Sequence, residues 1–193
     1  MKTTNFSRRA GIAFEIIAFV AFALLSRAAL MDVAWRFAGP LSLFCVLVVL
    51  TLYMHWRGRS WREFGLVRLA GRKAKLWVLV QSLMVFAAFC AAVASVLIAG
   101  HVFDLAFMEK IPQGVTDRWG DVHGNLPMLL LWLVIAWLSG GFAEEMFFRG
   151  YLVTRLRELF ASERAGSMAG SVLAVVLAAA FFGYGHMYYQ GLR

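Results

Sequence analysis

The sequence predicts an all-α membrane protein, a polytopic bundle of about five transmembrane helices. The first observation is composition: 62% of the 193 residues are hydrophobic and the mean hydropathy is +0.72, whereas the apolar share of a soluble domain is near half. The second is that uncharged runs long enough to cross a bilayer recur along the chain. The third is that arginines and lysines gather in alternate connecting segments, as they do in the cytoplasmic loops of membrane proteins.

About 20 consecutive apolar residues cross the hydrocarbon core as a helix, and the predicted spans are 11–30, 37–54, 76–100, 126–143 and 165–185. The last four contain no charged side chain. The first contains Glu15 and Arg27 and follows a basic N-terminus, so a cleaved signal peptide is the alternative. We expect the uncleaved span, because "SRA" at 26–28 is a poor cleavage site.

The connecting segments differ in charge. Residues 55–75 contain seven Lys/Arg and one Glu, whereas 101–125 contain two Lys/Arg and four acids. Basic loops stay in the cytoplasm, so we expect the N-terminus, 55–75 and 155–164 on that side. We expect a multi-pass protein of a bacterial plasma membrane, and the loop charges place its N-terminus in the cytoplasm.

The net charge of +8 lies mostly beside the spans, so the expected partners are anionic membrane lipids, not nucleic acid. Within the basic segment, aromatic and aliphatic residues alternate with arginines over 56–69, which predicts an interfacial amphipathic helix interrupted by Gly65. The first three predicted spans and the basic segment 55–75 lie within an N-terminal membrane region, 1–124, and the last two spans lie within 125–193.

The uncharged run 126–143 ends in a charged cluster, "GGFAEEMFFRGY" at 140–151. Charges at membrane depth are rare and mark functional positions, although an ordinary helix end just outside the membrane is the simpler alternative. Glu145 and Arg149 are four residues apart with the acid first, the favourable order for an ion pair on a helix. Glu144 points elsewhere on the helix and has no partner in the local sequence, so it is the candidate for proton transfer.

The candidate partner of Glu144 is His186, near the end of the last apolar run. If the chain turns near Arg164, Glu144 lies 20 residues before the turn and His186 lies 22 residues after it. Both are then about 30 Å from the turn, so antiparallel packing brings them to one level. Phe182 lies on the same helix face as His186. Gly183 and Gly185 allow a neighbouring helix or a substrate backbone to approach closely. A hydrogen-bonded structural histidine is the alternative.

These two motifs resemble those of the CPBP family of intramembrane proteases, also named the CAAX protease and bacteriocin-processing (Abi) family. "EEMFFRGY" fits the EExxxR motif of that family and "FGYGH" fits its FxxxH motif. "FFRGYL" and, in the basic loop, "SWREFGL" are also similar to it. The ordered pair of motifs on successive hydrophobic helices is far more specific than either motif alone, and the resemblance covers about 125–193.

The resemblance implies an intramembrane endopeptidase. Glu144 would be the general base that activates water, His186 would hold that water or stabilise the developing charge, and Glu145 with Arg149 would support them. The implied substrate is a peptide bond near a membrane, in a prenylated CAAX protein or a bacteriocin-type peptide. The family has been called metalloprotease, but its better-supported mechanism needs no metal. A zinc ion is the alternative cofactor, for which this chain offers no HExxH and only one histidine within a span.

Members of that family carry further motifs after the FxxxH helix, a histidine followed by an asparagine or aspartate on later spans. This sequence stops directly after its second motif, so we expect a truncated piece of a longer protein, with a naturally short member as the alternative. On that expectation the chain as given would be inactive. Two other functions stay open: a non-catalytic scaffold or immunity protein of the same family, and a small proton-coupled transporter.

Overall fold

The computed structural model describes residues 2–105, 113–160 and 168–187, and the side chains of 7–105, 115–160 and 168–186. These residues form helices and contain no strand, which confirms the all-α prediction. In chain order the helices are α1 (Lys2–Ala34), η1 (Trp35–Phe37), α2 (Ala38–Trp56), η2 (Trp61–Phe64), α3 (Gly71–Val102), α4 (Gln113–Trp119), η4 (Gly120–Val122), α5 (Leu126–Ile135), η5 (Ala136–Ala143), η6 (Glu145–Leu152), α6 (Val153–Phe160) and α7 (Met168–Met187).

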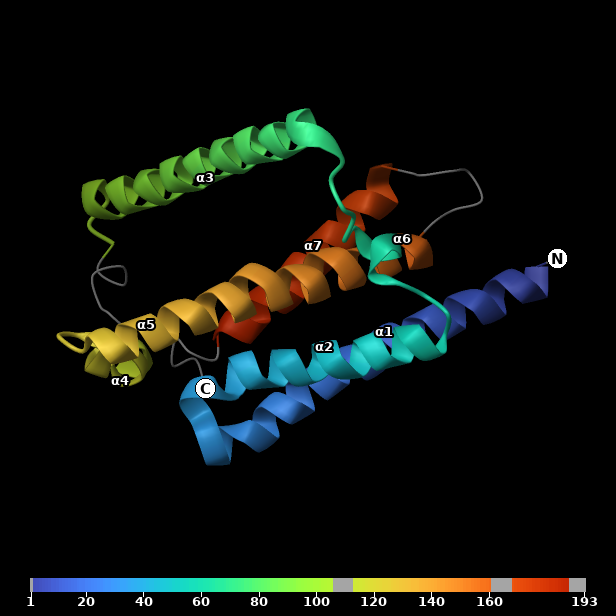
Figure 1. Ribbon diagram of the computed structural model, residues 1–193, viewed down its shortest axis with the longest axis horizontal. Coiled ribbons are helices and arrows are strands. Elements are labelled where there is room, and N and C mark those ends of the chain that lie inside the picture. Colours follow the sequence, from blue (N-terminus) through green and yellow to red (C-terminus); the bar gives the residue numbers. More distant parts are fainter. Residues whose placement is uncertain (1, 106–112, 161–167, 188–193) are drawn as a thin grey trace.

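Four helical stretches of the described chain are long and apolar enough to cross a membrane: Ser7–Trp56, Gly71–Val102, Leu126–Phe160 and Met168–His186. The first holds both α1 and α2, which η1 joins into a hairpin whose two helices lie side by side (Figure 1). The bundle of about five spans therefore agrees with the sequence prediction. The turn predicted near Arg164 falls within 161–167, outside the described residues.

The core lies between the α1–α2 hairpin, the helix 126–160 and α7. The α2 side chains Leu43, Val46, Leu50 and Met54 recur at helical spacing and are buried. From α7 the buried members of this core are Ala174 and Ala178, and Leu177 packs against it partly buried. Small residues such as these alanines let two membrane helices approach closely. The core thus combines residues of both predicted regions, 1–124 and 125–193.

Helix α3 stands apart from this core. Only 6% of its most apolar window is buried within the protein, and Figure 1 shows it beside the other helices rather than among them. Its apolar side chains are exposed along most of its length. In a bilayer, lipid tails solvate such a helix as well as protein does, so α3 needs no protein partner to span the membrane.

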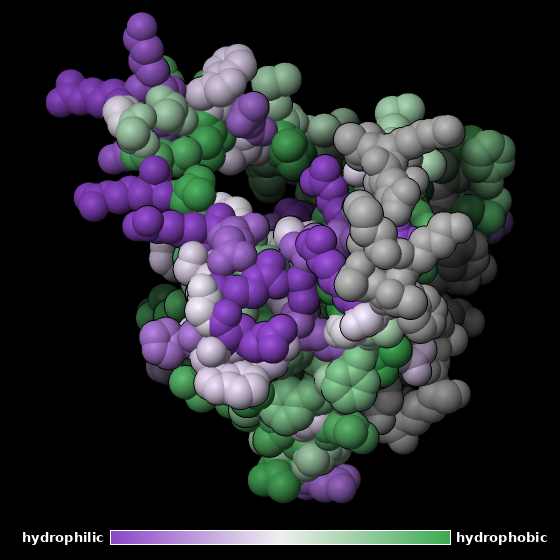
Figure 2. Space-filling view, turned by 90° about the vertical axis from the view of Figure 1, so that its right-hand side faces the viewer, coloured by the Kyte–Doolittle hydropathy of each residue, from purple (hydrophilic) through white to green (hydrophobic). Residues whose placement is uncertain are grey.

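Basic side chains gather at one end of the bundle, where α1 begins, α2 ends, α3 begins and α6 ends (Figure 1). The space-filling view onto that end shows a broad hydrophilic surface (Figure 2). The exposed lysines and arginines of these segments are Arg8, Arg9, Arg57, Arg62, Arg68, Arg72, Lys73, Lys75 and Arg157. The segments that the sequence places on one side of the membrane therefore do lie together.

The amphipathic helix predicted for 56–69 is wrong. Only the 3₁₀ turn η2 forms there, and the chain from Leu66 to Ala70 has no regular structure. Gly65 has φ 94, a left-handed conformation that ends a helix. Ser60 and Glu63 form a capping box that fixes η2. The backbone hydrogen bond from Ser60, together with Arg59, lowers the pKa of the Glu63 carboxyl, so the box holds at neutral pH and weakens as acid protonates Glu63.

Gly150 is required where η2 packs against η6. A Cβ at Gly150 would lie 3.0 Å from the carbonyl oxygen of Phe64, and the Phe64 ring packs against Tyr151 with centroids 5.7 Å apart. The phrases "SWREFGL" and "FFRGYL", far apart in the sequence, therefore meet in space. Gly183 is different: among the described residues outside its own helix, no atom lies within 4 Å of a Cβ placed there, so no described helix approaches Gly183 closely.

We predict that Gly150→Ala destabilises the protein by about 1–2 kcal/mol, because the new methyl group forces η2 away from η6. Gly183→Ala is the matched control and should be neutral or stabilising by up to about 1 kcal/mol, since alanine favours a helix and the site is open. Unfolding temperatures measured in lipid micelles check both variants. Equal stability of Gly150→Ala and the unsubstituted protein would contradict the contact with Phe64.

Candidate active site

Glu144 lies in the middle of a continuous helix, 126–160, whose hydrogen-bond pattern changes on both sides of it. Asn125 begins the helix: its side chain accepts a hydrogen bond from the Met128 N–H at 3.2 Å. From Ala136 to Ala143 and from Glu145 to Leu152 the turns are π-helical, and the Glu144 N–H bonds to Ser139 O. π-Helical turns are rare in proteins, and those that do occur are often found at functional sites.

The sequence predicts a helix through this region, with room or a bend at Gly140 and Gly141, and it does not predict the π-helical turns on both sides of Glu144. Gly140 and Gly141 precede Glu144, and residues without a side chain resist a widened turn least. A Cβ at Gly140 would lie 3.8 Å from a carboxylate oxygen of Glu144. Gly140 therefore lies in contact range of the Glu144 side chain, at a distance that a methyl group would also accept.

The two adjacent glutamates face different surroundings. Glu144 is half-buried and lines a cavity of about 500 Å³. Glu145 lies outside that cavity and forms an ion pair with Arg149, 2.7 Å between Nη1 and the carboxylate. The Arg149 side chain is 78% exposed, so this pair contributes little stability. The ion pair that the spacing predicts is thus present, and it leaves Glu144 as the carboxylate directed into the cavity.

His186 occupies the last turn of α7 and also lines the cavity. Its Nδ1 lies 3.0 Å from the carbonyl oxygen of Phe182. Because a carbonyl only accepts, Nδ1 carries the proton and Nε2 of a neutral ring is an acceptor. The Phe182 ring lies 4.3 Å from the imidazole and packs edge-on against Phe148. These contacts orient the imidazole from two helices.

The structure brings Glu144 and His186 to the same cavity, as the count of residues from each of them to the turn near Arg164 predicts. Both side chains line this cavity. The helix of Glu144 and α7 pack against each other through η6 and α6. The rest of the cavity wall is mainly apolar and aromatic, including Phe147, Phe148, Phe181, Phe182, Trp119 and Trp132. A carboxylate and an acceptor nitrogen therefore converge in an apolar site within the membrane-spanning part.

Two arginines, Arg27 and Arg118, also line this cavity. The sequence alone predicts no role for either of them. Arg27 comes from α1, and its Nη1 donates to the carbonyl oxygen of Gly185 at 2.5 Å. Arg118 comes from α4 and lies over the rings of Trp119 and Trp132, at 5.3 and 5.2 Å from their centroids. The signal for Arg27 was its charge within an apolar span. Nothing in the local sequence identifies its partner, 158 residues away.

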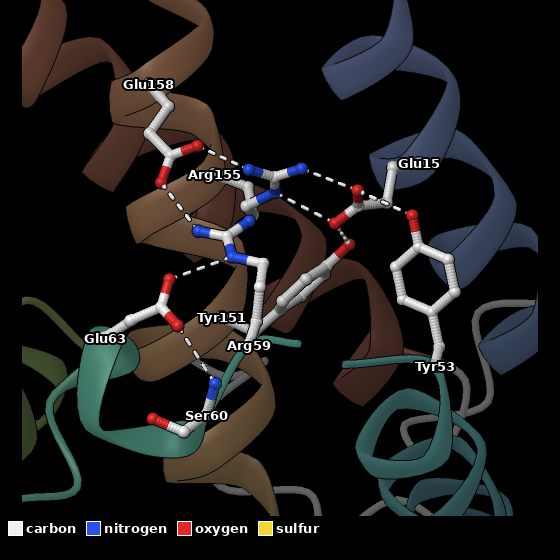
Figure 3. Close-up of polar contacts among 8 residues, drawn as sticks. All are labelled: Glu15, Tyr53, Arg59, Ser60, Glu63, Tyr151, Arg155 and Glu158. Atoms are coloured by element: carbon white, nitrogen blue, oxygen red, sulfur yellow. Dashed lines mark hydrogen bonds and ion pairs between the residues drawn. The ribbon is translucent and has the colours of Figure 1, made fainter. Parts of the chain in front are cut away.

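A second polar cluster ties α1 to α6 at the basic end of the bundle (Figure 3). Arg155 donates two hydrogen bonds to Glu15, at 2.9 and 2.5 Å, and the two side chains are 8% and 10% exposed. Tyr53 and Tyr151 donate to the same carboxylate at 3.0 and 2.9 Å. Both oxygens of Glu15 are fully engaged, so this buried charge is compensated.

This cluster continues to the surface. Arg155 also pairs with Glu158, and Arg59 bridges Glu158 and Glu63 at 3.3 and 2.9 Å. Four segments of the chain therefore meet in one network: α1, α2, the turn at η2 and the helix 126–160. It holds the helix that carries Glu144 against the N-terminal hairpin.

The fit of a metal ion can be judged from the donor set. Among the described residues, no three His, Cys, Asp or Glu side chains are grouped so as to hold a metal. A catalytic zinc takes three protein ligands. Glu144 and His186 supply two, and Glu145 is bound to Arg149 outside the cavity. The described donors thus do not fit a catalytic zinc site.

Comparison with known protein families finds a similarity in the C-terminal part of the chain. Residues 126–192 match the family model described as type II CAAX prenyl endopeptidase Rce1-like. The match spans both motifs, Glu144–Arg149 and Phe182–His186, and confirms the resemblance to the CPBP intramembrane proteases. No curated protein and no solved structure matches the chain.

Proposed function

Because residues 126–192 carry an Rce1-like domain, we propose that the protein is an intramembrane endopeptidase that hydrolyses a peptide bond with water activated by Glu144. The family is one of proteases, and the four long apolar stretches mark a membrane protein. The observation that carries the proposal is the convergence of Glu144 and His186 on a single apolar cavity.

In the proposed reaction, a water molecule lies between Glu144 and Nε2 of His186. Glu144 takes one proton of the water, and Nε2 accepts a hydrogen bond from the other, since Nδ1 is committed to Phe182. The water oxygen bonds to the scissile carbonyl carbon, the C–N bond breaks, and Glu144 passes its proton to the leaving nitrogen. The products are an amine and a carboxylic acid that keeps the second proton of the water; that proton then passes to the amine, which leaves a carboxylate and an ammonium group, and Glu144 is again a carboxylate.

The proposed substrate is a peptide of a membrane-associated protein, of the CAAX type or the bacteriocin type. The aromatic and aliphatic wall of the cavity favours an apolar peptide or a lipid-modified one. The basic end faces the cytoplasm in this proposal and binds anionic lipid headgroups, as the positive-inside rule implies.

The test is cleavage of a synthetic peptide by the purified full-length protein in lipid vesicles. Prenylated and unprenylated peptides of one CAAX sequence are compared, and mass spectrometry identifies the products. We expect cleavage of the prenylated peptide, and cleavage unchanged by EDTA or 1,10-phenanthroline, because no step passes through a metal. Intact peptides would contradict the proposal, and proton-coupled flux in the same vesicles would favour a transporter.

Inhibition of cleavage by a chelator would bear on the mechanism and not on the reaction. Loss of cleavage with chelator and its recovery with added zinc would contradict the metal-free mechanism, while leaving peptide hydrolysis itself in place. Cleavage of a bacteriocin-type leader peptide, but of neither CAAX peptide, would narrow the substrate class instead.

A further inference from the structure

The two charges of the first span lie outside the Rce1-like region, yet both bind to it. Glu15 pairs with Arg155, and Arg27 donates to Gly185. The family match begins at residue 126, so neither charge belongs to the matched domain. Charges in a membrane helix are retained when they have a function, and the proposed reaction uses neither of these two.

The first contact fixes α1 to the helix of Glu144. Arg155 is 11 residues after Glu144 in one continuous helix, 126–160. Its two hydrogen bonds to Glu15, at 2.9 and 2.5 Å, form a planar fork that sets both distance and orientation (Figure 3). Tyr53 of α2 holds the same carboxylate, so the whole hairpin shares this attachment.

The second contact fixes α1 to the helix of His186. Nη1 of Arg27 donates a hydrogen bond to the carbonyl oxygen of Gly185 at 2.5 Å, near the end of the described part of α7. Gly185 directly precedes His186, whose Nδ1 is bound to Phe182 one turn earlier. The donor from α1 therefore acts on the very turn that presents the imidazole to the cavity.

Both contacts belong to a single uninterrupted helix. Glu15 and Arg27 are 12 residues apart in α1 (Lys2–Ala34), which corresponds to about 18 Å along its axis. One end of this stretch holds the Glu144 helix and the other holds α7. The relative placement of the base and the histidine is thus set by α1 as well as by direct packing of their own helices.

We propose that Arg27 is a positioning residue for His186, and that α1, anchored by Glu15, is part of the catalytic unit. This inference rests on the proposed function for its kinetic consequence. Its structural content, that Arg27 orders the turn of His186, stands independently. It requires that α1 be present in the working protein.

The experiment replaces Arg27 by Met or by Gln, which remove the charged donor, and by Lys, which keeps a cation. Ser26→Ala is the matched control, because Ser26 is the neighbouring residue and its hydroxyl bonds only within α1, to Ala23 O at 3.1 Å. The first readout needs no peptidase activity: it is the rate at which diethyl pyrocarbonate modifies His186 in vesicles. His55, His101 and His123 serve as internal references.

We expect the His186 modification rate to rise about tenfold in Arg27→Met and Arg27→Gln, because losing a charge-assisted hydrogen bond opens the last turn of α7 more often. The reference histidines and Ser26→Ala should be unchanged. In the cleavage assay kcat should fall about tenfold to a hundredfold with KM nearly constant, since misplacing one group lowers the rate rather than binding. Arg27→Lys should lie within about threefold of the unsubstituted protein.

The outcomes separate this inference from the proposed function. An unchanged His186 rate in Arg27→Met or Arg27→Gln overturns the positioning role, whether or not the protein cleaves peptides. A raised rate in a protein that cleaves no peptide keeps the contact and sinks the proposed function. If Arg27→Met does not accumulate in membranes, the polar Arg27→Gln variant decides the question. The inference is also overturned if kcat of Arg27→Met or Arg27→Gln is no lower than kcat of Ser26→Ala.

Discussion

Replacing Glu144 by Gln is expected to lower kcat for peptide cleavage by about a thousandfold, with the protein folded and its membrane abundance normal. Gln has nearly the shape of Glu but cannot take a proton from water, and general-base catalysis contributes about 10²–10⁴-fold to a rate. The side chain lines a cavity and has no ion-pair partner among the described residues, so removing its charge breaks no salt bridge. Initial rates at saturating peptide in vesicles measure the effect.

The neighbouring residue provides the control. Glu145→Gln makes the same chemical change one position along, where the carboxylate pairs with an exposed Arg149 and lies outside the cavity. Because Glu145 supports the site only through its pair with Arg149, we expect kcat to fall far less than in Glu144→Gln, with a loss of stability of about 0.2–1 kcal/mol. If Glu145→Gln abolished cleavage and Glu144→Gln did not, the assignment of the two glutamates would be reversed. Normal activity in both would favour the scaffold function.

The largest effect on stability is expected at the buried ion pair. Arg155→Met leaves the carboxylate of Glu15 buried without its cation, and breaking such a pair costs about 3–5 kcal/mol. The pair is suited to this test because its side chains are only 8% and 10% exposed. The double variant Glu15→Gln with Arg155→Met removes both charges, so it should be more stable than Arg155→Met alone. Unfolding in a mixed-micelle denaturant series gives the three free energies.

Arg157→Met is the matched control for this cycle, since Arg157 is an exposed residue of the same helix. Its effect should stay within about 0.5 kcal/mol. A double variant that is less stable than Arg155→Met would show that Glu15 does more for the fold through Tyr53 and Tyr151 than through Arg155. Equal stability of Arg155→Met and Arg157→Met would contradict the buried pair.

The features that the sequence predicts correctly are those carried by local patterns. Hydropathy located the spans, because about 20 apolar residues in a row have few other uses. The pair Glu145–Arg149 follows from a spacing of four residues. The shared level of Glu144 and His186 follows from counting along two helices joined by a short connection, although that connection itself lies outside the described residues.

What the sequence does not predict depends on pairing across the fold. Glu15 meets Arg155 at a separation of 140 residues and Arg27 meets Gly185 at 158, and hydropathy does not say which spans are neighbours. The π-helical turns around Glu144 were also missed, because glycines permit such turns without requiring them. The turn η2 in the basic loop could have been predicted from the sequence, because "SWRE" at 60–63 fits the S-x-x-E capping box. That motif indicates a helical turn beginning at Ser60.

In the proposed reaction, water held by Glu144 and His186 attacks the peptide bond directly. A single turnover in water enriched in ¹⁸O, with protein in excess over the prenylated peptide, tests this step. We expect one ¹⁸O atom in the new carboxylate of the product and none in the protein. An ¹⁸O atom in the Glu144 side chain, with none in the product, would reveal attack by the carboxylate itself and contradict direct attack by water.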